Sequence, residues 1–139
     1  MTVNPADRLE IHELLARVTF GLDQRDPAMI EACFTSDAVF ELEIKDAEAI
    51  PPFVGREAIM NLMEDSMNAH SEDRRHVVSN IFFESADETG ADVVSTLVAF
   101  QAEHGKIGVM TSGVYRDRVV KAEGGWKISI RRLALDVPF

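Results

Sequence analysis

The side chains best suited to proton transfer in this sequence are four histidines: His12, His70, His76 and His104. A neutral imidazole can accept a proton at about pH 7, so each of them is a candidate general base. Their spacing matches no common zinc or iron site, and the sequence contains no P-loop, dinucleotide-binding fingerprint or nucleophile elbow. The residues therefore favour metal-free acid–base chemistry over hydrolysis.

His76 lies near the start of residues 75–84, a segment rich in Val, Ile and Phe that predicts a strand. Because side chains alternate along a strand, one face is predicted to carry His76, Val78, Asn80 and Phe82. If that face lines a cavity, Asn80 lies deeper in it and offers both a donor and an acceptor. The structural alternatives are a hydrogen-bonded sheet histidine for His76 and an edge or turn amide for Asn80.

Two later segments predict the walls of a small-molecule site. Alternation along residues 91–102 and 106–120 gives two faces: Val94, Thr96, Val98 and Phe100 on the first, and Val109, Thr111, Gly113 and Tyr115 on the second. Apolar side chains with a few hydroxyls are the usual lining of such sites. Tyr115, the only tyrosine, is as consistent with a wall or interface residue as with a proton donor.

The strands that carry these residues are preceded in the sequence by segments that predict helices, and the helices would help to position the site. Asn4-Pro5 is typical of a helix start and predicts a helix over residues 5–23, whose apolar side repeats at helical spacing: Ile11, Leu14, Leu15, Val18 and Leu22. Asp26-Pro27 predicts a short second helix, and Gly55 precedes a third helical pattern that ends near His70. Residues 38–44 predict an early strand, and residues 45–52 predict a loop.

Three helical segments around one early strand, followed by strands over residues 75–84, 91–102, 106–120 and 126–137, predict an α+β fold in a single domain spanning residues 1–139. The short connections between the last four strands predict a mainly antiparallel sheet. In the last strand the apolar face switches at Arg131-Arg132, which predicts a β-bulge there. A bulge bends a sheet, and a bent sheet can enclose a cavity.

The amino-acid composition limits the kinds of partner and the location that we expect for this protein. The chain carries 24 acidic and 14 basic residues, a net charge of −10 that would repel a phosphate backbone, so no nucleic-acid partner is expected. Cys33 is the only cysteine, no segment has the length and apolar content of a membrane span, and no signal peptide is recognisable. We therefore expect a cytoplasmic protein with no membrane partner.

Several short motifs follow one another along nearly the whole chain: Phe20-Gly-Leu-Asp23, Phe34-Thr-Ser-Asp37-Ala-Val-Phe, Gly55-Arg-Glu-Ala-Ile, Arg75-His76-Val-Val-Ser-Asn80, Gly113-Val-Tyr115-Arg-Asp117 and Gly125-Trp126-Lys-Ile. In this order and spacing the chain resembles the SnoaL-like family of the nuclear transport factor 2-like superfamily. The resemblance implies a cystatin-like conical barrel in which three N-terminal helical segments pack on a strongly curved sheet. Relatives include scytalone dehydratase, bile acid 7α-dehydratase, hexachlorocyclohexane dehydrochlorinase and ketosteroid isomerase, which work without metals or organic cofactors.

The resemblance also implies a catalytic pair. In the dehydratase and dehydrochlorinase relatives, an aspartate at the end of the first helix pairs with a histidine at the start of the first long strand, and Asp23 and His76 match those positions. Such a carboxylate fixes the imidazole tautomer and stabilises the imidazolium that forms on proton abstraction. Without the resemblance, the favoured interpretation of Asp23 is a turn residue at a helix end.

The sequence differs from these relatives at the positions of the residues that would donate a proton to the leaving hydroxyl. Several dehydratases carry tyrosines at positions that correspond here to Val18 and Leu42, which would instead form apolar parts of a substrate site. The basic residue that some relatives use to receive a departing anion has no secure match, although Arg132 or its neighbour Arg131 could turn inward at the predicted bulge. A buried arginine would need a carboxylate or an anionic ligand, and the alternative is a surface arginine.

The resemblance therefore leaves more than one function open. The first is a cofactor-independent lyase or isomerase, similar to a dehydratase, that acts on a small hydrophobic or polycyclic molecule through Asp23 and His76. The second is a non-catalytic binding or structural module of the same fold, or the small subunit of a ring-hydroxylating oxygenase. An open curved sheet leaves one face to be covered, so we expect a homodimer or homotrimer.

Overall fold

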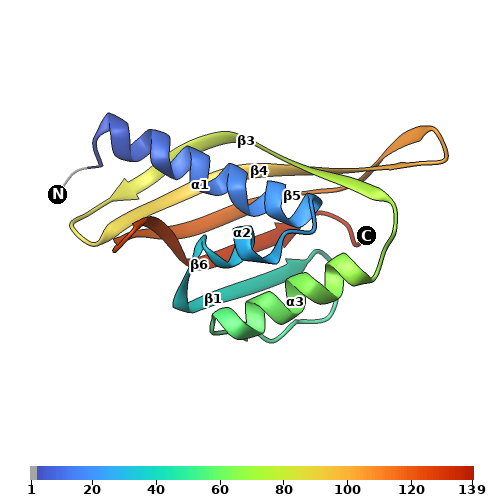
Figure 1. The fold of residues 1–139 in the computed structure, drawn as a ribbon, viewed down its shortest axis with the longest axis horizontal. Coiled ribbons are helices and arrows are strands. Elements are labelled where there is room, and N and C mark those ends of the chain that lie inside the picture. Colours follow the sequence, from blue (N-terminus) through green and yellow to red (C-terminus); the bar gives the residue numbers. More distant parts are fainter. Residues whose placement is uncertain (1–2) are drawn as a thin grey trace.

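The computed structural model describes residues 3–139 and shows helices packed on a six-stranded sheet (Figure 1). In the described residues, the helices are α1 (Pro5–Asp23), α2 (Pro27–Glu31) and α3 (Arg56–Asn68). The strands are β1 (Phe34–Ile44), β2 (Phe53–Val54), β3 (Asp73–Ala86), β4 (Gly90–Glu103), β5 (Lys106–Ala122) and β6 (Gly125–Leu135). The predicted α+β class is confirmed.

Helix α1 has the bounds that the sequence predicts, and local chemistry explains why. Asn4 accepts a hydrogen bond from the backbone of Asp7, and the Asp7 carboxylate accepts one from the backbone of Asn4, which completes a capping box with Pro5 in the first turn. Its apolar side is buried against the sheet: Ile11, Leu14, Leu15 and Val18. The helix ends at Asp23, and its last turn lies over the sheet (Figure 1).

The sheet has the strand order β2-β1-β6-β5-β4-β3. All neighbours pair antiparallel except β1 and β6, which pair parallel, so the sheet is mixed. Strand β1 begins at Phe34, earlier than predicted, and the short strand β2 was not predicted. The sheet is curved but not closed, because β2 and β3 are its two edges, so the predicted conical barrel is an open one.

Two irregularities decide which side chains face inward. In β6 the register against β5 shifts between Ile128 and Ile130, so the bulge lies at Ser129 rather than at the predicted Arg131-Arg132. In β3 the register against β4 shifts between Ser79 and Phe82, and Asn80 within that shift has a φ of 53°. An extra residue reverses the inward and outward faces of the strand beyond it. These bulges control the composition of the site.

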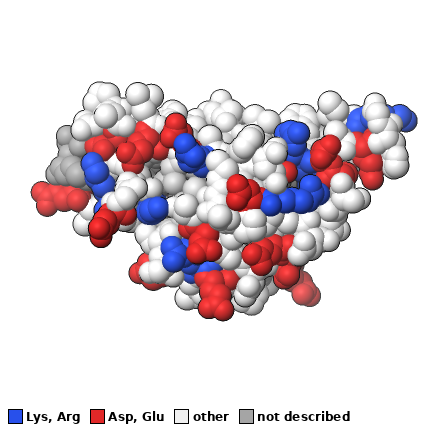
Figure 2. All heavy atoms as spheres, viewed as in Figure 1, with Lys and Arg blue, Asp and Glu red and all other residues white. Residues whose placement is uncertain are grey.

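Charged side chains of both signs are interspersed on the face shown in Figure 2, which offers no continuous basic surface for a phosphate backbone. The long β4–β5 hairpin extends beyond the rest of the molecule, and the C-terminal end of the chain lies near the start of β3 (Figure 1). Among residues 3–139, no helix combines the length and the apolar content needed to cross a membrane. The predicted cytoplasmic location stays a prediction.

Candidate active site

Asp23 and His76 are in direct contact, although 53 positions separate them in the sequence. The Asp23 Oδ1 atom lies 2.6 Å from the His76 Nδ1 atom, and Asp23 Oδ2 accepts a hydrogen bond of 2.8 Å from the His76 backbone N–H. Since a carboxylate only accepts, Nδ1 carries the ring proton and Nε2 is left as the basic nitrogen. Both side chains are shielded from solvent, with 5% and 10% of their areas exposed.

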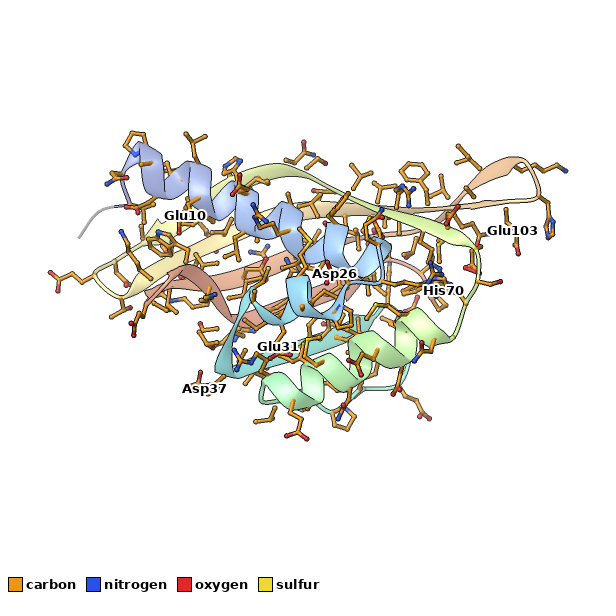
Figure 3. All side chains as sticks on the ribbon, viewed as in Figure 1. Glu10, Asp26, Glu31, Asp37, His70 and Glu103 are labelled. Carbon is orange, nitrogen blue, oxygen red and sulfur yellow. The ribbon has the colours of Figure 1, made fainter. Side chains whose placement is uncertain are left out.

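The turn after α1 is tied to the start of β3 by a second interaction. Arg25, which has a φ of 54°, reaches across and donates hydrogen bonds to the backbone carbonyls of Met67, His70 and Glu72. Figure 3 shows Asp26 just beyond α1 and His70 at the end of α3, where the chain turns into β3. These contacts hold the end of α1 against the strand that carries His76, so Asp23 and His76 meet in a fixed geometry.

The imidazole of His76 borders an apolar cavity of about 110 Å³ between the helices and the concave face of the sheet. The cavity is bounded by α1, α3, every strand from β3 to β6, β1, and the C-terminal end of the chain, through these residues: Val18, Thr19, Leu22, Phe40, Leu42, Leu62, Met63, Ser66, His76, Leu97, Thr111, Tyr115, Arg131, Leu133, Leu135 and Phe139. An apolar chamber with a few converging polar groups is typical of a small-molecule site.

Arg131 brings a positive charge to the wall of this cavity. Its guanidinium donates two hydrogen bonds to the Asp117 carboxylate, of 2.8 and 3.1 Å, and lies 3.9 Å above the centre of the Tyr115 ring. Arg131 and Asp117 are 1% and 2% exposed, so the pair lies inside the core. Burial, the largest single effect, lowers the pKa of Arg131, but the charge and hydrogen bonds of Asp117 together with the nearby Tyr115 and Cys33 outweigh it. The pKa is raised, so the arginine stays cationic.

Tyr115 stays a neutral phenol in this setting. Burial raises its pKa above the ordinary value for tyrosine; the charge of Arg131 opposes that rise, and the carboxylates of Asp117 and Asp23 add to it. Its hydroxyl is not sealed in the core and makes no hydrogen bond with any of residues 3–139. The hydroxyl is therefore free to bind a molecule in the cavity.

Four of the predicted substrate-site residues border the cavity together with the predicted catalytic His76: Val18, Leu42, Thr111 and Tyr115. The Thr111 hydroxyl already has a hydrogen-bond partner, because it donates a bond of 2.7 Å to the Val137 carbonyl. It therefore supports the C-terminal end of the chain as well as the cavity wall.

Four predicted site residues lie elsewhere, and their placement as cavity residues is wrong. Asn80 is exposed because the bulge in β3 turns it outward. Thr96 and Val98 lie on the outer face of β4, since Leu97 between them borders the cavity. Arg132 is exposed and pairs with Glu41 at 2.7 Å, because the bulge at Ser129 turns Arg131 inward in its place.

The sequence alone does not assign Asp117 to the site, and it makes Arg131 an alternative to Arg132. A signal was present, because both Asp117 and Arg131 sit in strands whose other inward positions are mostly apolar, and a buried arginine requires a carboxylate. Deciding between Arg131 and Arg132 required the position of the bulge.

A second, open hollow lies on the other side of the imidazole. This outer groove, of about 490 Å³, runs between α1 and β3, and both Asp23 and His76 border it together with His12, Phe20 and Val77. The imidazole thus separates the cavity from the outer groove. Within residues 3–139, no group of three His, Cys, Asp or Glu side chains is arranged to hold a metal ion.

Comparison with known proteins agrees with this architecture. The sequence profile of the SnoaL-like domain matches residues 5–132. The chain is 29% identical to Rv3472, a protein of unknown function from Mycobacterium tuberculosis, with a TM-score of 0.77 over 96% of this chain and 77% of that one. It is 25% identical to a proposed scytalone dehydratase from Novosphingobium aromaticivorans, with a TM-score of 0.79 over 97% and 87% of the two chains.

A more distant structure has the same fold. The proposed β subunit of an aromatic-ring-hydroxylating dioxygenase from Novosphingobium aromaticivorans is 15% identical, with a TM-score of 0.80 over 96% of this chain and 91% of that one. No curated protein sequence matches the chain.

Proposed function

Because the chain belongs to the SnoaL-like family, we propose that it is a cofactor-independent lyase or isomerase that acts on a small hydrophobic molecule. The observation that carries this proposal is the contact between Asp23 and His76 at the edge of an apolar cavity. A shielded imidazole whose one nitrogen is held by a carboxylate has its other nitrogen available as a general base. Proton abstraction from carbon is the reaction that this arrangement fits best.

In the proposed reaction, His76 Nε2 accepts a proton from a carbon atom next to an electron-withdrawing group such as a carbonyl. Asp23 keeps the proton on Nδ1 before the reaction and stabilises the imidazolium afterwards. The negative charge that develops on the substrate is stabilised by Arg131, a cation that borders the cavity. Loss of a group from the adjacent carbon gives elimination, and return of the proton elsewhere gives isomerisation.

The volume of the cavity limits the substrate. A dry cavity of roughly 150 Å³ is known to hold benzene, so the space beside His76, about 110 Å³, suits a molecule on the scale of a single ring. A polycyclic molecule would require the wall to open. The wall residues most suited to moving are Met63, whose side chain is flexible, and Phe139, which is 59% exposed.

The test is elimination of water from β-hydroxy ketones, beginning with a β-hydroxy cyclohexanone and extending to two-ring analogues, followed by the ultraviolet absorbance of the enone product. We expect His76→Ala and Asp23→Asn to lower turnover by about 10²-fold or more. His104→Asn is the matched control, because His104 is exposed in the β4–β5 turn with a φ of 53° that asparagine tolerates. Full activity in both dyad variants would refute the proposal.

The second candidate is a binding or structural module that keeps the cavity without catalysis. It is favoured by the cavity residues Val18 and Leu42, which stand where several dehydratase relatives carry tyrosines. The structural similarity to a proposed oxygenase β subunit also supports this candidate, because it shows that the same fold occurs in another class of protein. A cavity ligand bound with equal affinity by wild type and His76→Ala, without turnover by either, would support this candidate.

We also propose that the protein forms a homodimer or homotrimer. Large apolar side chains are exposed on the edge strand and on the projecting β4–β5 hairpin: Val77, Phe82, Ile107 and Val109. Several large apolar side chains exposed on one sheet are typical of an interface. A second copy of the chain would cover them.

A further inference from the structure

We propose that Tyr115 is the proton donor to a leaving oxygen, so that the site is built for substrates that lose a hydroxyl group rather than a halide. This inference rests on the proposed function, because it assigns the acid that complements His76 as the base. A hydroxyl group is a poor leaving group without a proton, whereas a halide leaves unaided. A proton donor at the cavity therefore specifies the chemical class of the substrate.

The position of Tyr115 satisfies the first requirement, which is access to the molecule that His76 attacks. His76 projects from β3 and Tyr115 from β5, and both border the same cavity of about 110 Å³. In so small a space, a molecule that reaches the imidazole also reaches the phenol. The Tyr115 hydroxyl has no hydrogen-bond partner among residues 3–139, so no rearrangement is needed before it binds a leaving oxygen.

Arg131 satisfies the second requirement, which is a positive charge beside the phenolate that forms. The Arg131 guanidinium lies 3.9 Å above the centre of the Tyr115 ring, so its positive charge faces the ring over which the phenolate charge spreads. Asp117 fixes the orientation of Arg131 through two hydrogen bonds. Before the reaction, burial keeps the phenol protonated by raising the pKa of Tyr115.

The other polar groups around the cavity are less suited to this role. Ser66, Thr19 and Thr111 carry aliphatic hydroxyls, which are much weaker acids than a phenol. Thr19 donates its hydroxyl to the Ala16 carbonyl, and Thr111 donates to the Val137 carbonyl. Arg131 is committed to Asp117 and holds its proton too tightly to act as an acid at about pH 7. Tyr115 is thus the best-placed donor on the side of the cavity away from α1.

The proposed step is balanced without a further reactant. His76 Nε2 takes the proton from carbon, the C–H electron pair becomes the new C=C bond, and the C–O electron pair leaves with the oxygen. That oxygen takes the Tyr115 proton and departs as water. The imidazolium then returns its proton to the phenolate through the released water, which restores both residues.

Two substrates that differ only in the leaving group test the inference. A β-hydroxy cyclohexanone needs a proton on its leaving oxygen, whereas a β-acetoxy cyclohexanone loses acetate, a stable anion. We expect Tyr115→Phe to lower kcat about 10²-fold or more with the hydroxy ketone and to change kcat less than about 3-fold with the acetoxy ketone. His76→Ala should be impaired with both.

Three results would overturn the inference. Full activity of Tyr115→Phe with the hydroxy ketone would show that the phenol is not the donor. An equal loss with both ketones would show that the ring binds the carbonyl group or supports the wall. If wild type, tested up to two-ring analogues of both ketones, eliminates neither leaving group, the proposed function fails first and the inference falls with it. Thermal unfolding of Tyr115→Phe, which removes only a hydroxyl, checks that the fold is intact.

Discussion

Arg131 is held by Asp117 in a buried ion pair in which two guanidinium nitrogens meet two carboxylate oxygens at 2.8 and 3.1 Å. The pair links β5 to β6 beside the cavity, and both side chains are almost fully buried. A buried cation in this position requires a carboxylate partner, because an unpaired buried charge would be strongly destabilising. Asp117 therefore holds the arginine in its charged form and fixes its orientation against the face of the Tyr115 ring.

Replacing Asp117 should be strongly destabilising. Asp117→Asn leaves Arg131 buried and uncompensated, and we expect the free energy of unfolding in urea to fall by about 3–5 kcal/mol. The matched control is Glu41→Gln, which removes the partner of the neighbouring Arg132 at the exposed surface and should cost less than about 1 kcal/mol. Equal effects of the two substitutions would contradict the buried pairing.

The stability of the N-terminal helix should depend on pH through Asp7. The Trp126 indole N–H, at 3.0 Å, is the main cause of a lowered pKa for the Asp7 carboxyl, and the Asn4 backbone and Lys121 act in the same direction. The folded state thus binds the proton less readily than the unfolded state. The contribution is complete above the pKa of the unfolded chain, about 4, and is lost as the pH falls through the lower folded value.

Asp7→Asn removes this contribution and keeps the shape of the side chain. We expect wild type to be more stable than Asp7→Asn at neutral pH, with the difference in unfolding free energy shrinking as the pH is lowered from 6 to about 3. Urea titrations at a series of pH values measure it. A difference that is constant across this range would mean that the Asp7 charge contributes nothing.

Gly113 should tolerate no side chain. A Cβ atom there would lie 2.5 Å from the Ala134 carbonyl oxygen and 3.2 Å from the Leu135 Cα atom, both of which are backbone atoms of β6. We expect Gly113→Ala to lower stability by about 1–3 kcal/mol and to displace the neighbouring cavity residues Thr111 and Tyr115. Gly108→Ala in the same strand is the control, because a Cβ atom there would have no other atom within 4 Å and stability should change by less than about 1 kcal/mol.

The proposed self-association predicts a mass larger than that of the monomer in solution. Ile107, on the projecting hairpin, is 78% exposed, and we expect Ile107→Lys to shift the protein toward monomer in sedimentation velocity experiments. Leu9 on α1 is 73% exposed but lies away from the hairpin, so Leu9→Lys should leave the oligomer intact. A monomeric wild type at micromolar concentration would refute the interface.

The sequence contains enough local information to predict most of the elements. Helix α1 could be given its bounds because Asn4, Pro5 and the apolar spacing act within a few residues of each other. The pairing of β1 with β6 could not be predicted in this way, since it joins distant segments and has no local pattern. The contact between Asp23 and His76 was expected only from the family resemblance, because 53 positions separate the two residues.

The site residues that were misplaced have a common physical cause. Strand alternation predicts a face only while the register is unbroken, and the bulges at Asn80 and Ser129 break it through contacts with neighbouring strands. In β4 no bulge is needed for the error, because both faces carry apolar side chains and alternation alone gives no preference for Leu97 over Val98. The inward positions of β4 and β6 therefore required the tertiary structure.

The most direct test of the central claim is the exchange of the α protons of cyclohexanone, a ligand with no leaving group, in D2O followed by NMR. If Asp23-bound His76 is the base that removes a proton from carbon, wild type accelerates deuterium uptake, and His76→Ala and Asp23→Asn each lose about 10²-fold or more of that acceleration, while His104→Asn retains it. Uptake at the wild-type rate in both dyad variants would contradict the claim.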